Sequence, residues 1–243
     1  MERIELADGQ VIIGDALEVM KQMEASSVDL IVVDPPYNVL EGFDLDNVRW
    51  DVFSTLADYV KFTEAWIQEC FRVLKPGRQM YVFWSQKYLP LFFKLRNPFT
   101  LKKILVWHRP NLVRKFTSRT WVYTYDFIFY LSKGEHVKVF NASFLKRENV
   151  DVIQCALPQS NFKGLDRRVH PTQKPVELIK LFIKISSNPG EVVMDPFAGS
   201  GTTGVAARLM NRRFILIEKD SKWKDVILAR LNEANLGMRL EDF

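Results

Sequence analysis

An acid, two prolines and a tyrosine stand together directly after a short apolar run. The run, residues 30–33, is apolar on both faces, which is typical of a buried parallel strand. Asp34, Pro35, Pro36 and Tyr37 follow it. The prolines cannot donate to a sheet ladder and restrict the residue before each of them, so they predict a stiff turn. We expect it at the carboxyl end of a strand, where open α/β sheets bind ligands, although such a turn alone could be a solvated strand end.

A second candidate site is a glycine-rich turn near the C-terminus. Asp195 ends an apolar run, and Gly199 and Gly201 precede residues 202–210, which have helical spacing. Glycines let the backbone approach a ligand closely, and amides at a helix start can hold a polar or anionic group. The turn lacks both the Gly-Lys-Ser/Thr ending of a nucleotide phosphate loop and the full three-glycine dinucleotide fingerprint. A helix-packing corner is the alternative.

Glu218 ends the next predicted strand, in the position where an acid binds ribose hydroxyls in nucleotide-binding α/β folds. Strand, glycine turn and acid together indicate a cofactor that contains adenosine. A solvated strand end is the alternative for this acid.

Apolar spacing divides the rest of the chain into alternating elements. Strands are expected at 10–13, 30–33, 79–84, 103–107, 125–131, 191–194 and 213–217, and helices at 16–24, 58–74, 87–94, 176–186, 202–210 and 221–235. This alternation predicts an α/β fold with a doubly wound, mostly parallel sheet of about seven strands and helices on both faces. Residues 38–57 have no clear period and are expected to form a surface loop or lid.

Size and composition fit an ordinary globular protein. The 243 residues suit one large domain, and a net charge of +5 permits a polyanionic partner. The charged start is unlike a signal peptide and no apolar run could span a bilayer, so a cytoplasmic protein without membrane contact is expected. Cys70 and Cys155 have no metal-ligand spacing, and no metal is expected.

Basic residues gather in two segments, 109–119 and 163–168, with aromatic residues near them. Such clusters favour contact with nucleic-acid phosphates over ordinary solvated loops. The candidate phosphate-binding residues are Arg109, Arg114, Lys115, Arg119, Lys163, Arg167 and Arg168.

Taken together, Asp-Pro-Pro-Tyr at 34–37 and Asp-Pro-Phe-Ala-Gly-Ser-Gly-Thr at 195–202 resemble the S-adenosylmethionine-dependent amino methyltransferases of DNA, specifically the adenine-N6 family. The catalytic motif comes first, as in the permuted beta group. Matching residues also occur at Gly14-Asp15, Leu74-Lys75-Pro76-Gly77, His170-Pro171-Thr172-Gln173-Lys174-Pro175 and Glu218. The resemblance covers most of the chain and is weak at about 108–169.

The resemblance implies a Rossmann-like methyltransferase fold in a single domain, 1–243. Its parts would be a catalytic half at about 1–107, a variable basic target-recognition region at about 108–169 and a cofactor-binding half at about 170–243. It implies methyl transfer to the N6 amine of adenine, with base flipping and direct in-line transfer, on DNA that is expected to be double-stranded. A homodimer and a cognate restriction endonuclease are left open as partners.

An exocyclic adenine amine is a poor nucleophile because its lone pair is delocalised into the ring. Asp34 would accept one N–H of this amine and the Pro35 carbonyl the other, which favours the positive charge that develops on the nitrogen. Pro36 helps fix the turn, and Tyr37 would stack on the extruded base.

By the same resemblance, a larger set forms the cofactor pocket: Asp195, Phe197, Ala198, Gly199, Ser200, Gly201 and Thr202. Glu218 would take the ribose hydroxyls and Asp15 the cofactor's adenine amine, although Asp15 could instead cap the helix that follows it. Thr172 and Lys174 would close over the methionine end, with Lys174 near the carboxylate; an exposed lysine is the alternative. His170 is expected to be structural.

Three rival functions stay open: methylation of cytosine N4, methylation of adenine in RNA, and nucleic-acid binding without catalysis. Within the resemblance, Asp rather than Ser at position 34 favours adenine. The intact 34–37 motif disfavours a protein without catalytic activity.

Overall fold

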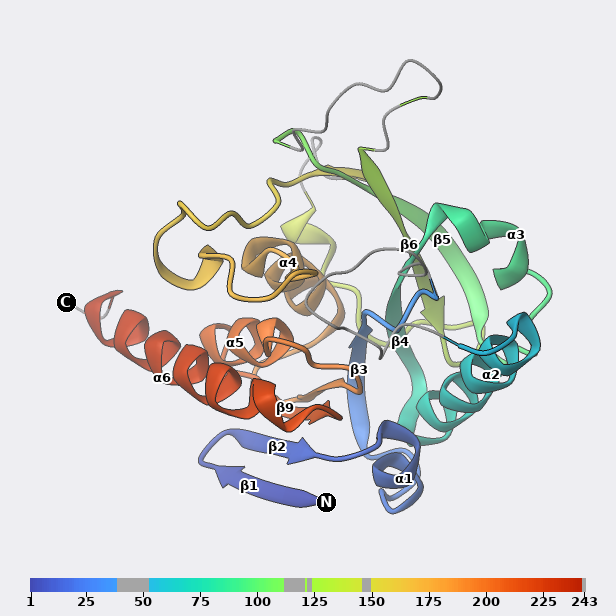
Figure 1. Cartoon of the computed structure of the whole chain (residues 1–243), viewed down its shortest axis with the longest axis horizontal. Helices are drawn as coiled ribbons and strands as arrows, with labels where there is room; N and C mark the ends of the chain where they lie inside the picture. The colour runs from blue at the N-terminus through green and yellow to red at the C-terminus, as the bar shows by residue number, and fades with distance from the viewer. Residues whose placement is uncertain (39–52, 112–120, 122–123, 146–149, 242–243) are drawn as a thin grey trace.

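A single mixed β-sheet with helices on both faces forms the core of the protein (Figure 1). The computed structural model describes residues 1–38, 53–111, 121, 124–145 and 150–241, with side chains described up to residue 235. The strand order in the sheet is β1-β2-β9-β8-β3-β4-β6-β5-β7. The predicted α/β class is therefore confirmed, with nine strands where about seven were predicted.

The strands are β1 (Glu2–Leu6), β2 (Gly9–Ile13), β3 (Val28–Val33), β4 (Leu74–Trp84), β5 (Thr100–His108), β6 (Tyr125–Ser132), β7 (Val152–Gln154), β8 (Val192–Asp195) and β9 (Arg213–Glu218). The α-helices are α1 (Ala16–Lys21), α2 (Leu56–Val73), α3 (Leu89–Phe92), α4 (Val176–Ser186), α5 (Thr202–Leu209) and α6 (Lys224–Glu241). The five strands from β2 to β4 in the sheet order are parallel to one another. The pairs β1–β2, β4–β6 and β5–β6 are antiparallel.

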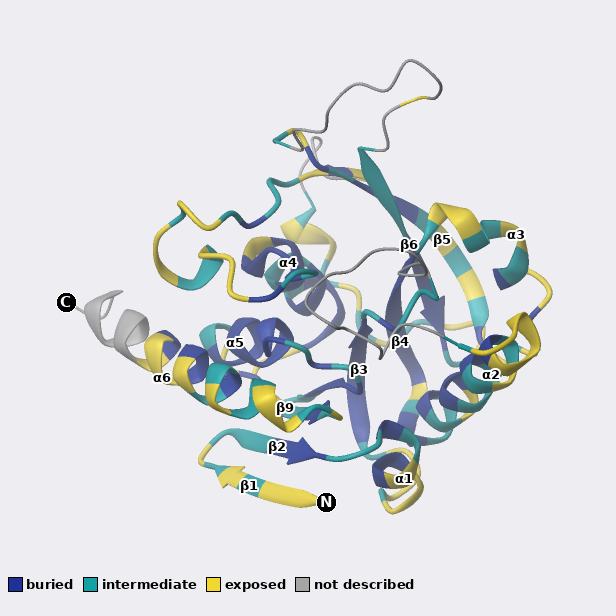
Figure 2. Cartoon of the chain, in the orientation of Figure 1, coloured by how far each residue is buried: buried dark blue, intermediate teal, exposed yellow. Residues whose placement is uncertain are grey.

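Strand β3 lies in the middle of the sheet and is buried along its whole length (Figure 2). Leu30 and Val32 pack on the face covered by α4, α5 and α6. Ile31 and Val33 pack on the opposite face, against α1 and α2. Because successive side chains of a strand point to opposite faces, a strand covered on both sides must be apolar throughout. This explains the continuous apolar run before Asp34.

The connections that follow β3 and β8 lead toward opposite edges of the sheet. From β3 it crosses through α2 to β4 on one side, and from β8 it crosses through α5 to β9 on the other. Neighbouring strands whose connections leave in opposite directions open a crevice at their carboxyl ends, and open α/β sheets bind ligands there. The turns after β3 and β8 are the two predicted motifs.

The sequence patterns did not predict β1 and β7, the two outermost strands of the sheet. Strand β1 pairs with β2 through a short turn, and its side chains are mostly exposed, so it lacks a strong apolar signal. Strand β7 has only three residues and pairs with β5, which is distant in sequence. Residues 75–77, predicted to stop a helix, lie within β4 directly after α2, and Gly77 has a positive φ of 78°. Most of the predicted loop at 38–57 lies outside the described residues.

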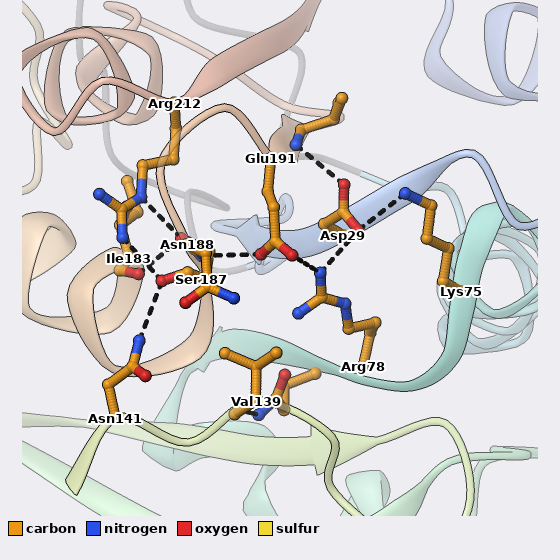
Figure 3. A network of polar contacts seen from close by, with 12 residues as sticks. Asp29, Lys75, Arg78, Val139, Asn141, Ile183, Ser187, Asn188, Glu191 and Arg212 are labelled. Atoms are coloured by element: carbon orange, nitrogen blue, oxygen red, sulfur yellow. Dashed lines mark hydrogen bonds and ion pairs between the residues drawn. The ribbon is translucent and has the colours of Figure 1, made fainter.

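A buried polar network ties the amino ends of β3, β4 and β8 together, at the sheet edge opposite the two motifs (Figure 3). Asp29 is 4% exposed and accepts from Arg78 Nη2 at 2.7 Å, from Lys75 Nζ at 2.8 Å and from the Val192 N–H at 3.0 Å. The same Arg78 nitrogen also contacts Glu191. One guanidinium thus joins a carboxylate of β3 to the carboxylate that directly precedes β8.

Replacing Arg78 by methionine is expected to lower the free energy of unfolding by about 3 kcal/mol, because Glu191 would lose its cation and Asp29 would keep only Lys75 as a cation. Denaturant titration followed by circular dichroism measures the change. The matched control is Lys180→Met, which removes the exposed pair of Lys180 with Glu177 and should cost under about 1 kcal/mol. Equal midpoints for the two variants would contradict the assigned role of Arg78.

Candidate active site

The acids at the carboxyl ends of β3, β8 and β9, together with the acid that follows β2, line one cavity of about 410 Å³. This volume lies in the range of small-molecule sites. The predicted residues that line it are Asp15, Asp34, Pro36, Thr172, Lys174, Asp195, Phe197, Ala198, Gly199, Ser200, Thr202 and Glu218. Pro35, Tyr37 and Gly201 belong to the same turns but do not line the cavity. Strand order therefore brings together residues up to about 200 positions apart in the chain.

Both oxygens of the Asp34 carboxylate are engaged by protein side chains. The Tyr37 hydroxyl donates to Oδ1, and the Lys174 ammonium contacts Oδ2. Lys174 is 9% exposed, and its Nζ lies 5.0 Å from the ring centroid of Phe83 and 5.8 Å from that of Tyr37. The alternative of an exposed lysine is therefore wrong. In this structure Lys174 and Tyr37 both contact the carboxylate of Asp34.

The glycine turn holds its shape through backbone and acid contacts. Gly199 and Gly201 have positive φ values of 53° and 78°, and a Cβ on Gly201 would lie 2.9 Å from Ile227 Cγ2. Asp195 accepts from the Phe197 N–H at 3.0 Å and from Thr203 Oγ1 at 2.6 Å. Burial raises the pKa of Asp195 to about 7. The turn therefore forms part of the cavity wall and is more than a helix-packing corner.

Glu218 faces the cavity from the end of β9. Its two carboxylate oxygens accept from the Gly199 N–H at 2.7 Å and the Asp220 N–H at 2.8 Å. Burial raises the pKa of this carboxyl. A carboxylate has about four acceptor positions, so Glu218 keeps acceptor capacity for a ligand hydroxyl. This arrangement fits the ribose of an adenosine-containing cofactor and excludes a merely solvated strand end.

Asp15 does cap the helix that follows it. Its Oδ1 accepts from the Leu17 N–H at 3.0 Å and the Glu18 N–H at 3.4 Å, while Oδ2 lies 3.1 Å from Lys219 Nζ. Capping by Asp15 is therefore confirmed, and its contact with the cofactor stays a prediction. Because Asp15 also lines the cavity, capping does not exclude a contact with the cofactor.

Sequence reasoning missed the aromatic wall of the cavity, which consists of Phe53, Phe62, Phe83 and Trp223. The Phe62 ring lies 5.9 Å from that of Phe197, and Trp223 lies 4.2 Å from His170. His170 Nδ1 accepts from the Thr172 N–H at 3.2 Å, and burial, reinforced by the charge of Lys174, lowers its pKa to about 4. A neutral, packed histidine agrees with the structural role expected for it. These aromatics sit at ordinary apolar positions, and no spacing marks them.

The predicted phosphate-binding residues fall into three groups. Arg109 is 9% exposed, and its Nη1 lies 3.3 Å from Asp126 Oδ2 while its Nη2 donates to the Tyr125 carbonyl. Its side chain is therefore packed against β6 and does not face solvent, in contrast to the prediction. Lys163, Arg167 and Arg168 are exposed around a short 3₁₀ turn, Gly164–Asp166. Arg114, Lys115 and Arg119 lie outside the described residues.

A family model for DNA methylases of the N6/N4 methyltransferase type matches residues 28–229. The chain belongs to this DNA methylase family. This methyltransferase is 28% identical over 242 residues to the type II methyltransferase M.HpaI of Haemophilus parainfluenzae, a match that covers 93% of the chain and 74% of M.HpaI. It is 32% identical over 241 residues to the type II methyltransferase M.HinfI of Haemophilus influenzae, covering 90% and 67%.

Solved structures agree with this assignment. The complex of M1.HpyAVI with S-adenosylmethionine superposes with a TM-score of 0.71 at 27% identity, covering 92% of this methyltransferase and 99% of that chain. The cytosine-N4-specific PvuII DNA methyltransferase has a TM-score of 0.72 at 21% identity, covering 93% and 94%, and shares the fold. The protein is thus a DNA methyltransferase that uses S-adenosylmethionine, with the expected Rossmann-like fold. No helix in the described part of the chain is long and apolar enough to cross a membrane.

Proposed function

We propose that this methyltransferase modifies the N6 amine of adenine in duplex DNA, with the turn at 34–37 as the catalytic motif. The observation that carries the proposal is the position of Asp34, which lines the same cavity as the glycine turn and Glu218. An acid at this point can hold an amine beside the cofactor. An acid in place of a serine at position 34 supports adenine over cytosine, by resemblance.

The bound cofactor supplies an electrophilic methyl group. Asp34 accepts one N–H of the target amine and the Pro35 carbonyl accepts the other, so that both stabilise the positive charge that develops on the nitrogen. Pro36 fixes the turn, and the ring of Tyr37 stacks on the extruded base. Lys174 contacts Asp34 Oδ2 in this structure, and the Asp34 carboxylate has further acceptor positions for the amine. The carboxylate of the cofactor's methionine end is a suitable new partner for Lys174.

For the cofactor, Glu218 binds the ribose hydroxyls and Asp15 the adenine amine. The residues at 195 and 197–202 surround the methionine and adenosine parts, with Thr172 at the methionine end. The position of Glu218 in the cavity wall and its remaining acceptor capacity support this assignment. The proposed phosphate contacts come from Lys163, Arg167 and Arg168 and from the basic residues at 114, 115 and 119.

Cytosine-N4 methylation is the second candidate, because the matched family model covers both kinds of enzyme. The deciding experiment incubates unmethylated genomic DNA with the protein and S-adenosylmethionine, then quantifies modified nucleosides by mass spectrometry. We expect N6-methyladenine without N4-methylcytosine, and the reverse result would overturn the proposal. Sequencing of the same DNA maps the target site, and competition with duplex RNA tests the RNA alternative.

Five further features of the protein stay predictions: the permuted beta grouping, the three-part division of the domain, a homodimer, a cognate restriction endonuclease and a cytoplasmic location. Sedimentation of the purified protein measures its oligomeric state.

A further inference from the structure

Arg230 of α6 joins two parts of the molecule that the proposed reaction uses separately. Its side chain is buried, with 5% exposure. Nη1 donates to the Ser200 carbonyl at 2.8 Å, to Ser200 Oγ at 3.0 Å and to Thr202 Oγ1 at 2.9 Å. Nη2 donates to the Leu165 carbonyl at 2.8 Å. One planar group thus connects the glycine turn with residues 164–166.

Burying a guanidinium opposes folding unless its hydrogen bonds are satisfied. Burial lowers the pKa of Arg230 to about 10, which still leaves it charged at neutral pH. A side chain that only filled space at this position would not need a charge. The fork of donors instead matches oxygens on two separate segments, a geometry that a lysine cannot reproduce.

The two segments that Arg230 connects have different proposed roles. Ser200 and Thr202 line the cofactor cavity. Leu165 lies in the 3₁₀ turn whose neighbours Lys163, Arg167 and Arg168 are exposed.

Gln173 also holds the backbone of this segment. Its Nε2 donates to the Arg167 carbonyl at 3.2 Å, and its Oε1 accepts from the Val169 N–H at 2.9 Å. Because Gln173 also lines the cavity, the basic segment is fixed to the cofactor site at two points.

We propose that Arg230 is a positioning residue that couples cofactor binding to DNA binding through residues 163–168. A bound cofactor would contact the glycine turn, and Arg230 would transmit the effect of that contact to the backbone that carries Lys163, Arg167 and Arg168. By linkage, DNA then strengthens cofactor binding by the same factor. The inference rests on the proposed phosphate contacts of these three residues.

The test measures the dissociation constant of a fluorescein-labelled duplex that contains the mapped methylation site, with and without saturating S-adenosylhomocysteine. For the unaltered protein we expect tighter DNA binding with the cofactor product, by a factor on the order of tenfold. Arg230→Met and Arg230→Lys should both lower this factor clearly, while the contacts of Gln173 preserve part of it. The lysine variant keeps the charge and protects the test against a methionine variant that fails to fold.

Arg208→Met is the matched control. Arg208 is also 5% exposed and bonds to Asp8 and to the Leu231 carbonyl, away from the cavity. It should lose stability but keep the cofactor-dependent factor.

Four outcomes would overturn the proposal. The first two are the absence of a cofactor effect on DNA affinity in the unaltered protein and an unchanged cofactor effect in folded Arg230 variants. The others are an equal loss of the cofactor effect in Arg208→Met, and undiminished DNA binding when Lys163, Arg167 and Arg168 are all replaced by alanine. Adenine methylation by the unaltered protein is measured in parallel. If methylation occurs without coupling, only the role of Arg230 fails. If methylation is absent, the proposed function fails.

Discussion

Asp34→Ala is expected to lower kcat for DNA methylation by on the order of 10²–10³-fold, while the dissociation constant for S-adenosylhomocysteine stays nearly unchanged. The carboxylate is proposed to interact with charge that develops only in the transition state, and removal of one such electrostatic contact has effects of this size in other enzymes. Single-turnover transfer of a labelled methyl group gives the rate, and isothermal titration calorimetry gives the affinity.

Two further variants separate the contacts of Asp34. Tyr37→Phe removes the hydroxyl that donates to Oδ1 but keeps the ring, so its effect should stay under about tenfold if the ring mainly stacks. The double variant Asp34→Ala with Lys174→Met avoids leaving a buried ammonium without its carboxylate. It should fold and still be inactive. Undiminished methylation in either variant that lacks Asp34 would overturn the catalytic role.

Glu218→Ala is expected to weaken cofactor binding by about 10²-fold, because two hydrogen bonds from ribose hydroxyls to a charged group are lost at roughly 1.5 kcal/mol each. The Gly199 and Asp220 N–H groups also lose their acceptor. Calorimetry with S-adenosylhomocysteine measures the change.

Glu218→Gln keeps the size and one acceptor oxygen, so it should lose less affinity than alanine. Glu177→Ala is the matched control, since Glu177 is an exposed acid of α4 outside the cavity. An affinity of Glu218→Ala equal to that of the control would contradict the ribose assignment.

Local sequence patterns were enough to find the two motifs and their meeting point. The acids at 34, 195 and 218 each follow an apolar run, and carboxyl ends of parallel strands share one edge of a sheet. The shared edge thus follows from the parallel strands, whereas the closeness of the three acids depends on the strand order β9-β8-β3.

Side-chain partners over long distances could not be predicted in this way. Lys174 lies 140 positions from Asp34, and its direction depends on how the segment before α4 packs over Phe83. Arg109 looked like a solvated basic residue because its partner Asp126 belongs to another strand. Arg230 stands in a helix with ordinary apolar spacing, and only the packed structure shows what it contacts.

The central position of β3 has a consequence for motion during catalysis. The strand is paired on both edges and covered by helices on both faces, so local opening there would break nearly the whole fold. Asp34 is joined directly to this strand and therefore has a backbone anchor with very little freedom. Rearrangements that admit the base must come from side chains such as Lys174 and from the segments around the cavity. The proposed catalytic acid would therefore keep a fixed position, and the substrate and cofactor would be brought to it.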